Sequence, residues 1–310
     1  MKLKPGGGDF VWMAAGAAAL LAVVVVVLHF QSNPAAQLAF NARRVDLVGR
    51  MELDVASASE AEKSAVLAET DDAAKAFADQ AREASGRVEQ ERRELEGLLA
   101  AGGSSGEREL LAQFTAAFAE LEHVDDDLLT LAVKNTNVKA YSLAFGPAAA
   151  ALADVNVALT RLATANADLS DGKTILTLAY GAEISDLRIE ALLPPHIAEE
   201  SDAKMDALEA RMATEDAHVT RCLHDLGALP KVGKDPALAV ATARYADFSS
   251  LRTQILALSR ENTNVRSLSI SLNQKRKVMR VCQAALSALQ QAILAEPIAG
   301  SANGSPIRPR

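Results

Sequence analysis

The strongest constraint on the fold is a thirteen-residue segment that occurs twice. "LAVKNTNVKAYSL" spans residues 131–143, and "LSRENTNVRSLSI" spans residues 258–270. Six of the thirteen positions are identical without a gap, four more are conservative, and equivalent residues lie 127 positions apart. Solenoid repeats have periods of about 20–50 residues. The longer spacing therefore predicts a duplicated structural unit.

The composition favours helices throughout. Of the 310 residues, 49% are apolar but only 4% are aromatic. Alanine and leucine dominate, and Ala, Leu, Glu, Lys and Arg are strong helix formers. Strand patterns with period two are nearly absent outside a valine run at 23–27. We therefore expect an all-α protein.

The valine run belongs to a candidate membrane helix over residues 10–30, which contains no Asp, Glu, Lys or Arg. Twenty-one helical residues span a hydrocarbon core of about 30 Å. Trp12 lies near one end, as interfacial aromatic residues do. Lys2 and Lys4 precede the helix and place residues 1–9 in the cytoplasm, although three arginines soon after the helix weaken this orientation.

A cleaved signal peptide is the alternative, but its apolar core is about 7–15 residues and therefore shorter. Both interpretations export the chain after residue 35. We expect a single-pass protein of the inner membrane with its bulk in the periplasm. A tail over 297–310, rich in Pro, Gly and Ser, is expected to be disordered.

Each copy of the repeat is expected to form an antiparallel four-helix bundle, one over residues 35–170 and one over 171–296. The apolar spacing and the loop-forming stretches give the helix bounds. In the second copy, Pro194 and Pro195 are expected to end the first helix. The predicted helices are 34–69, 70–101, 107–135 and one from Val138 onward, then 172–193, one ending near Leu229, 236–261 and 263–295.

The repeated Asn-Thr-Asn step has two interpretations. Asn and Thr bond to nearby backbone and favour caps and turns, which predicts the tip of a helix hairpin with Asn137 or Thr136 capping the following helix. Leu131, Asn135 and Val138 also suit one continuous helix with polar residues inside it. The sequence leaves both open.

A membrane helix leading into an exported four-helix unit, with the step "(A/S)xxNTNV(K/R)(A/S)xSL", resembles the sensory module of bacterial methyl-accepting chemotaxis proteins. The likeness covers residues 10–170 as one module and 172–296 as a second. It implies sensing of a small ligand outside the membrane, as a homodimer. The chain has no second membrane helix, HAMP-type linker or cytoplasmic signalling hairpin, so a membrane receptor partner would have to transmit any signal.

The candidate ligand-binding residues are the repeated amides and the cation beside each pair. A cation with amide groups at a bundle tip would hold a small anionic ligand such as a carboxylate. The alternative is a turn whose charge is only solvated. The candidates are Asn135, Asn137, Lys139, Asn262, Asn264 and Arg266.

Other sites are weaker. His218 and Cys222 share a helical face, but with Cys282 they supply three ligands where a closed metal site needs four. A Cys222–Cys282 disulfide is not expected, because their helices would lie diagonally in a bundle. The basic run 274–280 is either a solvated face or a contact for anions or lipid headgroups.

Enzymatic motifs for nucleophilic, metal-dependent or phosphate-binding chemistry are absent from the sequence. The net charge of −8 argues against a nucleic-acid partner. We therefore expect a sensory, ligand-binding helical protein that is not an enzyme and has no cofactor. The alternative is an anchored helical scaffold or interaction protein without a small ligand.

Overall fold

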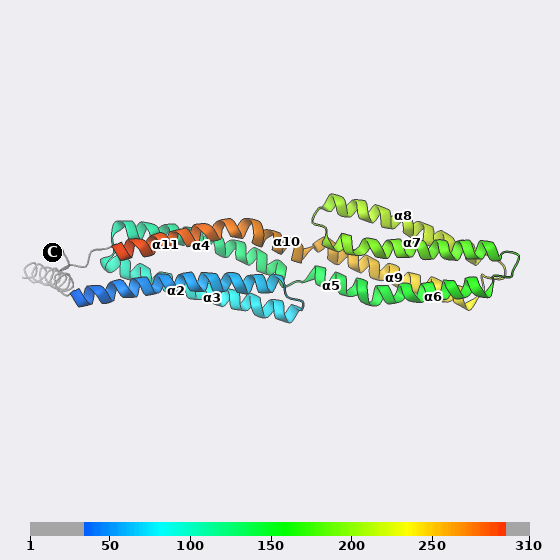
Figure 1. The fold of residues 1–310 in the computed structure, drawn as a ribbon, viewed down its shortest axis with the longest axis horizontal. Coiled ribbons are helices and arrows are strands. Elements are labelled where there is room, and N and C mark those ends of the chain that lie inside the picture. The colour runs from blue at the N-terminus through cyan, green and yellow to red at the C-terminus, as the bar shows by residue number, and fades with distance from the viewer. Residues whose placement is uncertain (1–33, 296–310) are drawn as a thin grey trace, which may run out of the picture. The chain divides into compact units, whose positions relative to one another are not determined.

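The computed structural model describes residues 34–295, and every regular element in this range is helical, as the composition predicts (Figure 1). The predicted membrane helix over 10–30, the segment 1–9 and the tail over 297–310 lie outside the described residues. The elements are α2 (Pro34–Val66), α3 (Asp71–Gly102), α4 (Ser105–Ala132), α5 (Thr136–Leu143), η1 (Ala144–Ala148), α6 (Ala149–Ala165), α7 (Gly172–Ala198), α8 (Asp202–Ala228), α9 (Pro236–Glu261), α10 (Thr263–Ile270), η2 (Ser271–Lys275) and α11 (Arg276–Ala295).

The predicted end of the helix at Pro194 and Pro195 is wrong, because α7 continues through both prolines to Ala198. Tertiary contacts hold this last turn. His196 is fully buried, with its Nδ1 2.8 Å from Ser259 Oγ and its Nε2 2.8 Å from Glu209 Oε1. Such contacts outweigh the backbone hydrogen bonds that proline cannot donate.

The described chain divides into two compact units. The first unit contains residues 34–58, 82–121 and 277–295, and the second contains Ser59–Ala81 and Glu122–Arg276. In the first unit, one apolar core joins α2, α3, α4 and α11. Its members include Leu47, Met51, Leu95, Phe114, Leu286 and Leu289.

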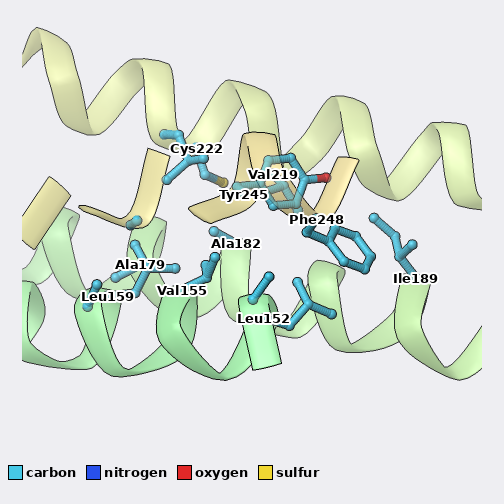
Figure 2. Packing of buried hydrophobic residues seen from close by; sticks show 14 of the residues in the cluster. Leu152, Val155, Leu159, Ala179, Ala182, Ile189, Val219, Cys222, Tyr245 and Phe248 are labelled. Carbon is cyan, nitrogen blue, oxygen red and sulfur yellow. The ribbon is translucent and has the colours of Figure 1, made fainter. Parts of the chain in front are cut away.

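The main core of the second unit joins α5 through α9. Figure 2 shows Leu152, Val155 and Leu159 of α6 near Ala179 and Ala182 of α7, with Val219, Cys222, Tyr245 and Phe248 from α8 and α9. Small side chains at the helix contacts allow the backbones to approach closely. A smaller core near the ends of α2, α3 and α4 completes this unit.

This division differs from the predicted boundary between residues 170 and 171. The fourth helix of each copy packs with the first three helices of the other copy: α5–α6 joins α7, α8 and α9, whereas α11 joins α2, α3 and α4. Both fourth helices carry an apolar stripe of similar spacing. Apolar spacing alone therefore does not choose between the two partnerships.

The two copies also share an irregular helical turn. The π-helical turns η1 and η2 begin at Ala144 and Ser271, which are equivalent positions of the repeat. Pro147 lies inside η1, where its missing N–H is one reason for an altered backbone pattern.

Two described helical stretches, 105–165 and 236–295, are long and apolar enough to cross a membrane. Core helices of soluble proteins pass the same test of length and composition, so the finding is weak evidence for membrane association.

Candidate functional site

Both repeated Asn-Thr-Asn steps are helix breaks. Asn135 separates α4 from α5, and Asn262 separates α9 from α10. Their φ angles are 50° and 53°, and they are the two non-glycine residues with positive φ in the described chain. Asn adopts this left-handed conformation more readily than other side chains. The continuous-helix interpretation is therefore wrong.

The hairpin interpretation also needs correction, because the helix after each break joins the other copy's core. At the breaks the two copies meet and cap each other. Thr136 N donates to Thr263 Oγ1 at 3.2 Å, and Thr263 N donates to Thr136 Oγ1 at 3.1 Å. Asn137 N and Asn264 N likewise donate to each other's side-chain Oδ1, at 3.2 and 3.1 Å. Thr136 and Asn137 thus do cap a helix, but it is the equivalent helix 127 residues away.

The four asparagine amides pair with near two-fold symmetry. Asn137 Nδ2 donates to Asn262 Oδ1 at 2.8 Å, and Asn264 Nδ2 donates to Asn135 Oδ1 at 2.8 Å. The symmetry ends at the C-terminal end of α7. There Asn137 Nδ2 also donates to the carbonyl of Ile197 in the last turn of α7, and Asn262 Nδ2 donates to the carbonyl of Glu199, the residue that caps the helix. Asn135 Nδ2 is buried without a hydrogen-bond partner. We call this cluster the junction; it consists of Asn135, Thr136, Asn137, Asn262, Thr263 and Asn264.

The two predicted cations lie at the surface beside the junction. Lys139 Nζ is 2.8 Å from Asp71 Oδ2, and Arg266 Nη2 is 3.9 Å from Asp202 Oδ1. Asp71 and Asp202 each lie in the first turn of a helix, where a carboxylate is favourable. The structure thus brings the four predicted asparagines into one cluster, and each predicted cation already faces a carboxylate.

A groove that the sequence did not reveal lies between α7 and α8. It has a volume of about 700 Å³, which is within the range of small-molecule sites. Arg188 and Arg211 line it from different helices, beside the apolar residues Ala191, Leu192 and Leu208. No motif links these arginines in sequence. The lining residues are Arg188, Ala191, Leu192, Pro195, Leu208, Arg211, Thr214 and Glu215.

The two arginines differ in their partners. Arg188 Nη1 lies 3.3 Å from Glu215 Oε1, and 63% of its side chain is exposed. Within residues 34–295, no carboxylate lies within ion-pair distance of Arg211. A planar guanidinium without a protein carboxylate is well suited to bind the carboxylate of a ligand.

The basic run 274–280 is divided between two environments. Lys275 is buried and pairs with Glu62 Oε2 at 2.5 Å and Asp125 Oδ1 at 2.8 Å. Neither interpretation of the run predicted this role for Lys275. Arg276, Lys277 and Arg280 are exposed.

A further buried carboxyl lies in α7. Asp186 is fully buried, and neither of its oxygens has a well-aligned hydrogen bond. Burial, and then the charge of Glu183, raise the pKa of Asp186 to about 7.

The remaining candidates do not assemble a metal site. Among the described residues, no three His, Cys, Asp or Glu side chains are grouped to hold a metal ion. His218 lies 3.0 Å from Ser185 Oγ and 3.9 Å from Cys222 Sγ. Cys222 and Cys282 belong to different compact units and form no disulfide.

Comparison with known proteins adds no relative: no family model, curated protein or solved structure matches the chain.

Proposed function

We propose that this chain is a sensory module that binds a small anionic ligand and has no enzymatic activity. The groove between α7 and α8 supports this proposal most directly. Two arginines, Arg188 and Arg211, line a space of about 700 Å³ together with Ala191, Leu192 and Leu208. Such a site suits a carboxylate on a short apolar body, because the charge pairs with arginine and the body covers the apolar floor.

The ligand would contact Arg211 first. Arg188 is held by Glu215 at 3.3 Å, which is longer than the usual 2.7–2.9 Å of a charge-assisted hydrogen bond. An incoming carboxylate would replace Glu215 as the ion-pair partner of Arg188. This exchange links ligand binding to the packing between α7 and α8.

The proposal includes the location and the partners. Residues 10–30 would anchor the chain in the inner membrane, with the N-terminus in the cytoplasm and the bundles in the periplasm. The protein would form a homodimer and would signal through a membrane receptor.

The test is thermal unfolding of the purified full chain against a panel of small carboxylates and other metabolites. A ligand at 100 times its Kd stabilises the native state by about 2.7 kcal/mol. We expect one carboxylate class to raise the Tm, and Arg211→Ala to remove the shift. Arg221→Ala is the matched control, because Arg221 is also exposed on α8 but does not line the groove.

Lys139→Ala and Arg266→Ala form the second arm of the same experiment. If they remove the shift and Arg211→Ala does not, the ligand binds beside the junction, at the two cations and the four asparagines predicted from the sequence. A shift that survives all three substitutions would contradict both locations.

A helical scaffold without a ligand is the second candidate function. The mutual hydrogen bonds of the junction favour it, because most of these polar groups are already satisfied within the chain. The absence of any shift across a broad panel, with a cooperative transition, would support the scaffold.

A further inference from the structure

Helix α7 is apolar on two opposite faces. One face packs in the core of its unit through residues such as Ala179, Ala182 and Ile189 (Figure 2). The other face is at the surface, where Tyr180, Ile184 and Leu187 remain 45%, 51% and 46% exposed. An amphipathic helix at the surface of a single bundle needs only one apolar face. The second face is therefore available to a partner.

The exposed face has the spacing of a coiled-coil seam. Its residues recur at alternating intervals of three and four, and none is charged. This is the 3.5-residue repeat that two supercoiled helices require. We call this face the α7 stripe; it consists of Thr177, Tyr180, Ile184, Leu187, Ala191 and Pro194.

An aromatic pair extends the stripe at one end. Tyr141 Oη donates to Pro194 O at 3.4 Å, which places the Tyr141 ring beside the last residue of the stripe. Phe145 stacks on Tyr141 with ring centroids 5.9 Å apart, and it is 66% exposed. Contiguous exposed apolar surface of this kind marks interaction sites.

We propose that the α7 stripe binds the same stripe of a second copy of this chain, with the two α7 helices parallel. The flanking charges favour this arrangement. Glu183, which is partly buried, lies on one side of the seam. Arg188, which is exposed and lies 3.3 Å from Glu215 of its own chain, lies on the other side five residues later. In a parallel pair, Glu183 of one copy faces Arg188 of the second copy and competes with Glu215 for it, and the reciprocal pair forms by symmetry. An antiparallel pair would oppose like charges.

This inference takes from the proposed function only the expectation of a homodimer. The stripe and the groove share Ala191, and Arg188 borders both, whereas Arg211, which the ligand experiment tests, lies outside the stripe. Its failure would leave the ligand experiment unaffected. Conversely, a dimer without a ligand would fit the scaffold.

Disulfide cross-linking of the full chain in its membrane tests the interface. Single cysteines would replace Tyr180, Leu187 or Ala191, and a mild oxidant would be added. In a parallel seam each new cysteine lies opposite the same cysteine of the second chain, so all three variants form cross-linked dimers. Val240→Cys on α9 is the matched control, because Val240 is 47% exposed, like Tyr180 and Leu187.

We expect cross-linking at the three stripe positions to be roughly tenfold faster than at Val240, because the seam raises the effective concentration of the paired thiols. Cross-linking at one position alone would indicate an antiparallel pair and overturn the parallel arrangement. Equal rates at the stripe and at Val240 would overturn the interface itself.

Charge exchange gives an independent readout on the chain carrying Leu187→Cys. Glu183→Arg should slow cross-linking, because two arginines then face each other. Adding Arg188→Glu should restore the rate, because the opposite charges are again paired. Slowing by the single substitution without recovery in the double variant would contradict the predicted register. An unchanged Tm would confirm that each variant folds.

Discussion

Thr136 and Thr263 accept each other's backbone N–H. The donor–acceptor distances are 3.2 and 3.1 Å, and the two hydroxyl oxygens lie 3.2 Å apart. Both residues are buried and both begin a helix. Each helix start thus depends on a side chain from the other copy, so the duplication forms a contact as well as a repeated pattern.

We expect the two threonines to be energetically coupled. Thr136→Val leaves the buried N–H of Thr263 without an acceptor, which costs about 1–3 kcal/mol of unfolding free energy. Because each residue interacts with the other, the double Thr136→Val, Thr263→Val variant should deviate from additivity by about 0.5–3 kcal/mol. Urea unfolding of the parent chain, the two single variants and the double variant measures this coupling.

Thr164→Val is the control for this cycle. Its hydroxyl donates to Thr160 O within its own exposed helical turn, so its substitution should change the stability by less than about 0.5 kcal/mol. Strict additivity of the two junction substitutions would contradict the reciprocal capping.

The two left-handed asparagines should differ in cost when they are changed to glycine, which tolerates the same φ. Asn262→Gly removes the bonds from Asn262 Nδ2 to Glu199 O and from Asn137 Nδ2 to Asn262 Oδ1. Asn135→Gly removes the single bond from Asn264 Nδ2 to Asn135 Oδ1, and it also removes the buried Asn135 Nδ2 that has no hydrogen-bond partner. We expect Asn262→Gly to be more destabilising by about 1 kcal/mol in urea unfolding. An equal cost would indicate that the turn after α7 does not contact the junction in solution.

Lys275→Met should be among the most destabilising single substitutions in the second unit. It leaves Glu62 and Asp125 facing each other without a cation, and loss of one partner of a buried ion pair costs about 3–5 kcal/mol. Adding Glu62→Gln and Asp125→Asn should recover part of the loss. Lys277→Met, at an exposed neighbouring position, is the control. Calorimetric or urea unfolding that showed equal effects at 275 and 277 would rule out the buried pairing.

The stability of the protein should depend on pH through Asp186. Its pKa is raised to about 7 in the folded chain, against about 3.9 when unfolded. Between these two pKa values the folded state keeps a proton that the unfolded state has released. The free energy of unfolding therefore falls as pH rises from about 4 to 7. Asp186→Asn should be stabilising by about 1–3 kcal/mol at pH 8 and near neutral at pH 4.

Melting temperatures of both proteins between pH 4 and 8 check this dependence, with Asp168→Asn as an exposed carboxyl control. A constant difference in Tm between Asp186→Asn and the parent chain would contradict it.

The helices were largely predictable, whereas their partners were not. Asp235 and Pro236 supply an N-cap and a first-turn proline, and α9 spans the predicted residues 236–261. Local signals of this kind lie within a few residues of the helix end. The exchange of the fourth helices depends on contacts between equivalent apolar stripes, which sequence spacing does not distinguish.

The candidate sites show the same limit. The repeat identified the residues of the junction, because the same letters appear twice. It did not show that they pair with each other, since a contact across 127 residues leaves no local pattern. The groove combines Arg188 and Arg211 from adjacent helices, and each arginine alone resembles an ordinary surface residue.

The matching π-helical turns show how far side chains can differ on one irregular backbone. A π-turn accommodates one more residue than the corresponding α-helical turn. Because η1 and η2 occupy equivalent positions, the irregular turn belongs to the repeat and not to either copy alone. The side chains within the turn nevertheless differ: one copy contains Pro147, and the other ends at the buried Lys275, where the first copy has Ala148. The same irregular backbone thus carries an internal ammonium in one copy and a methyl group in the other.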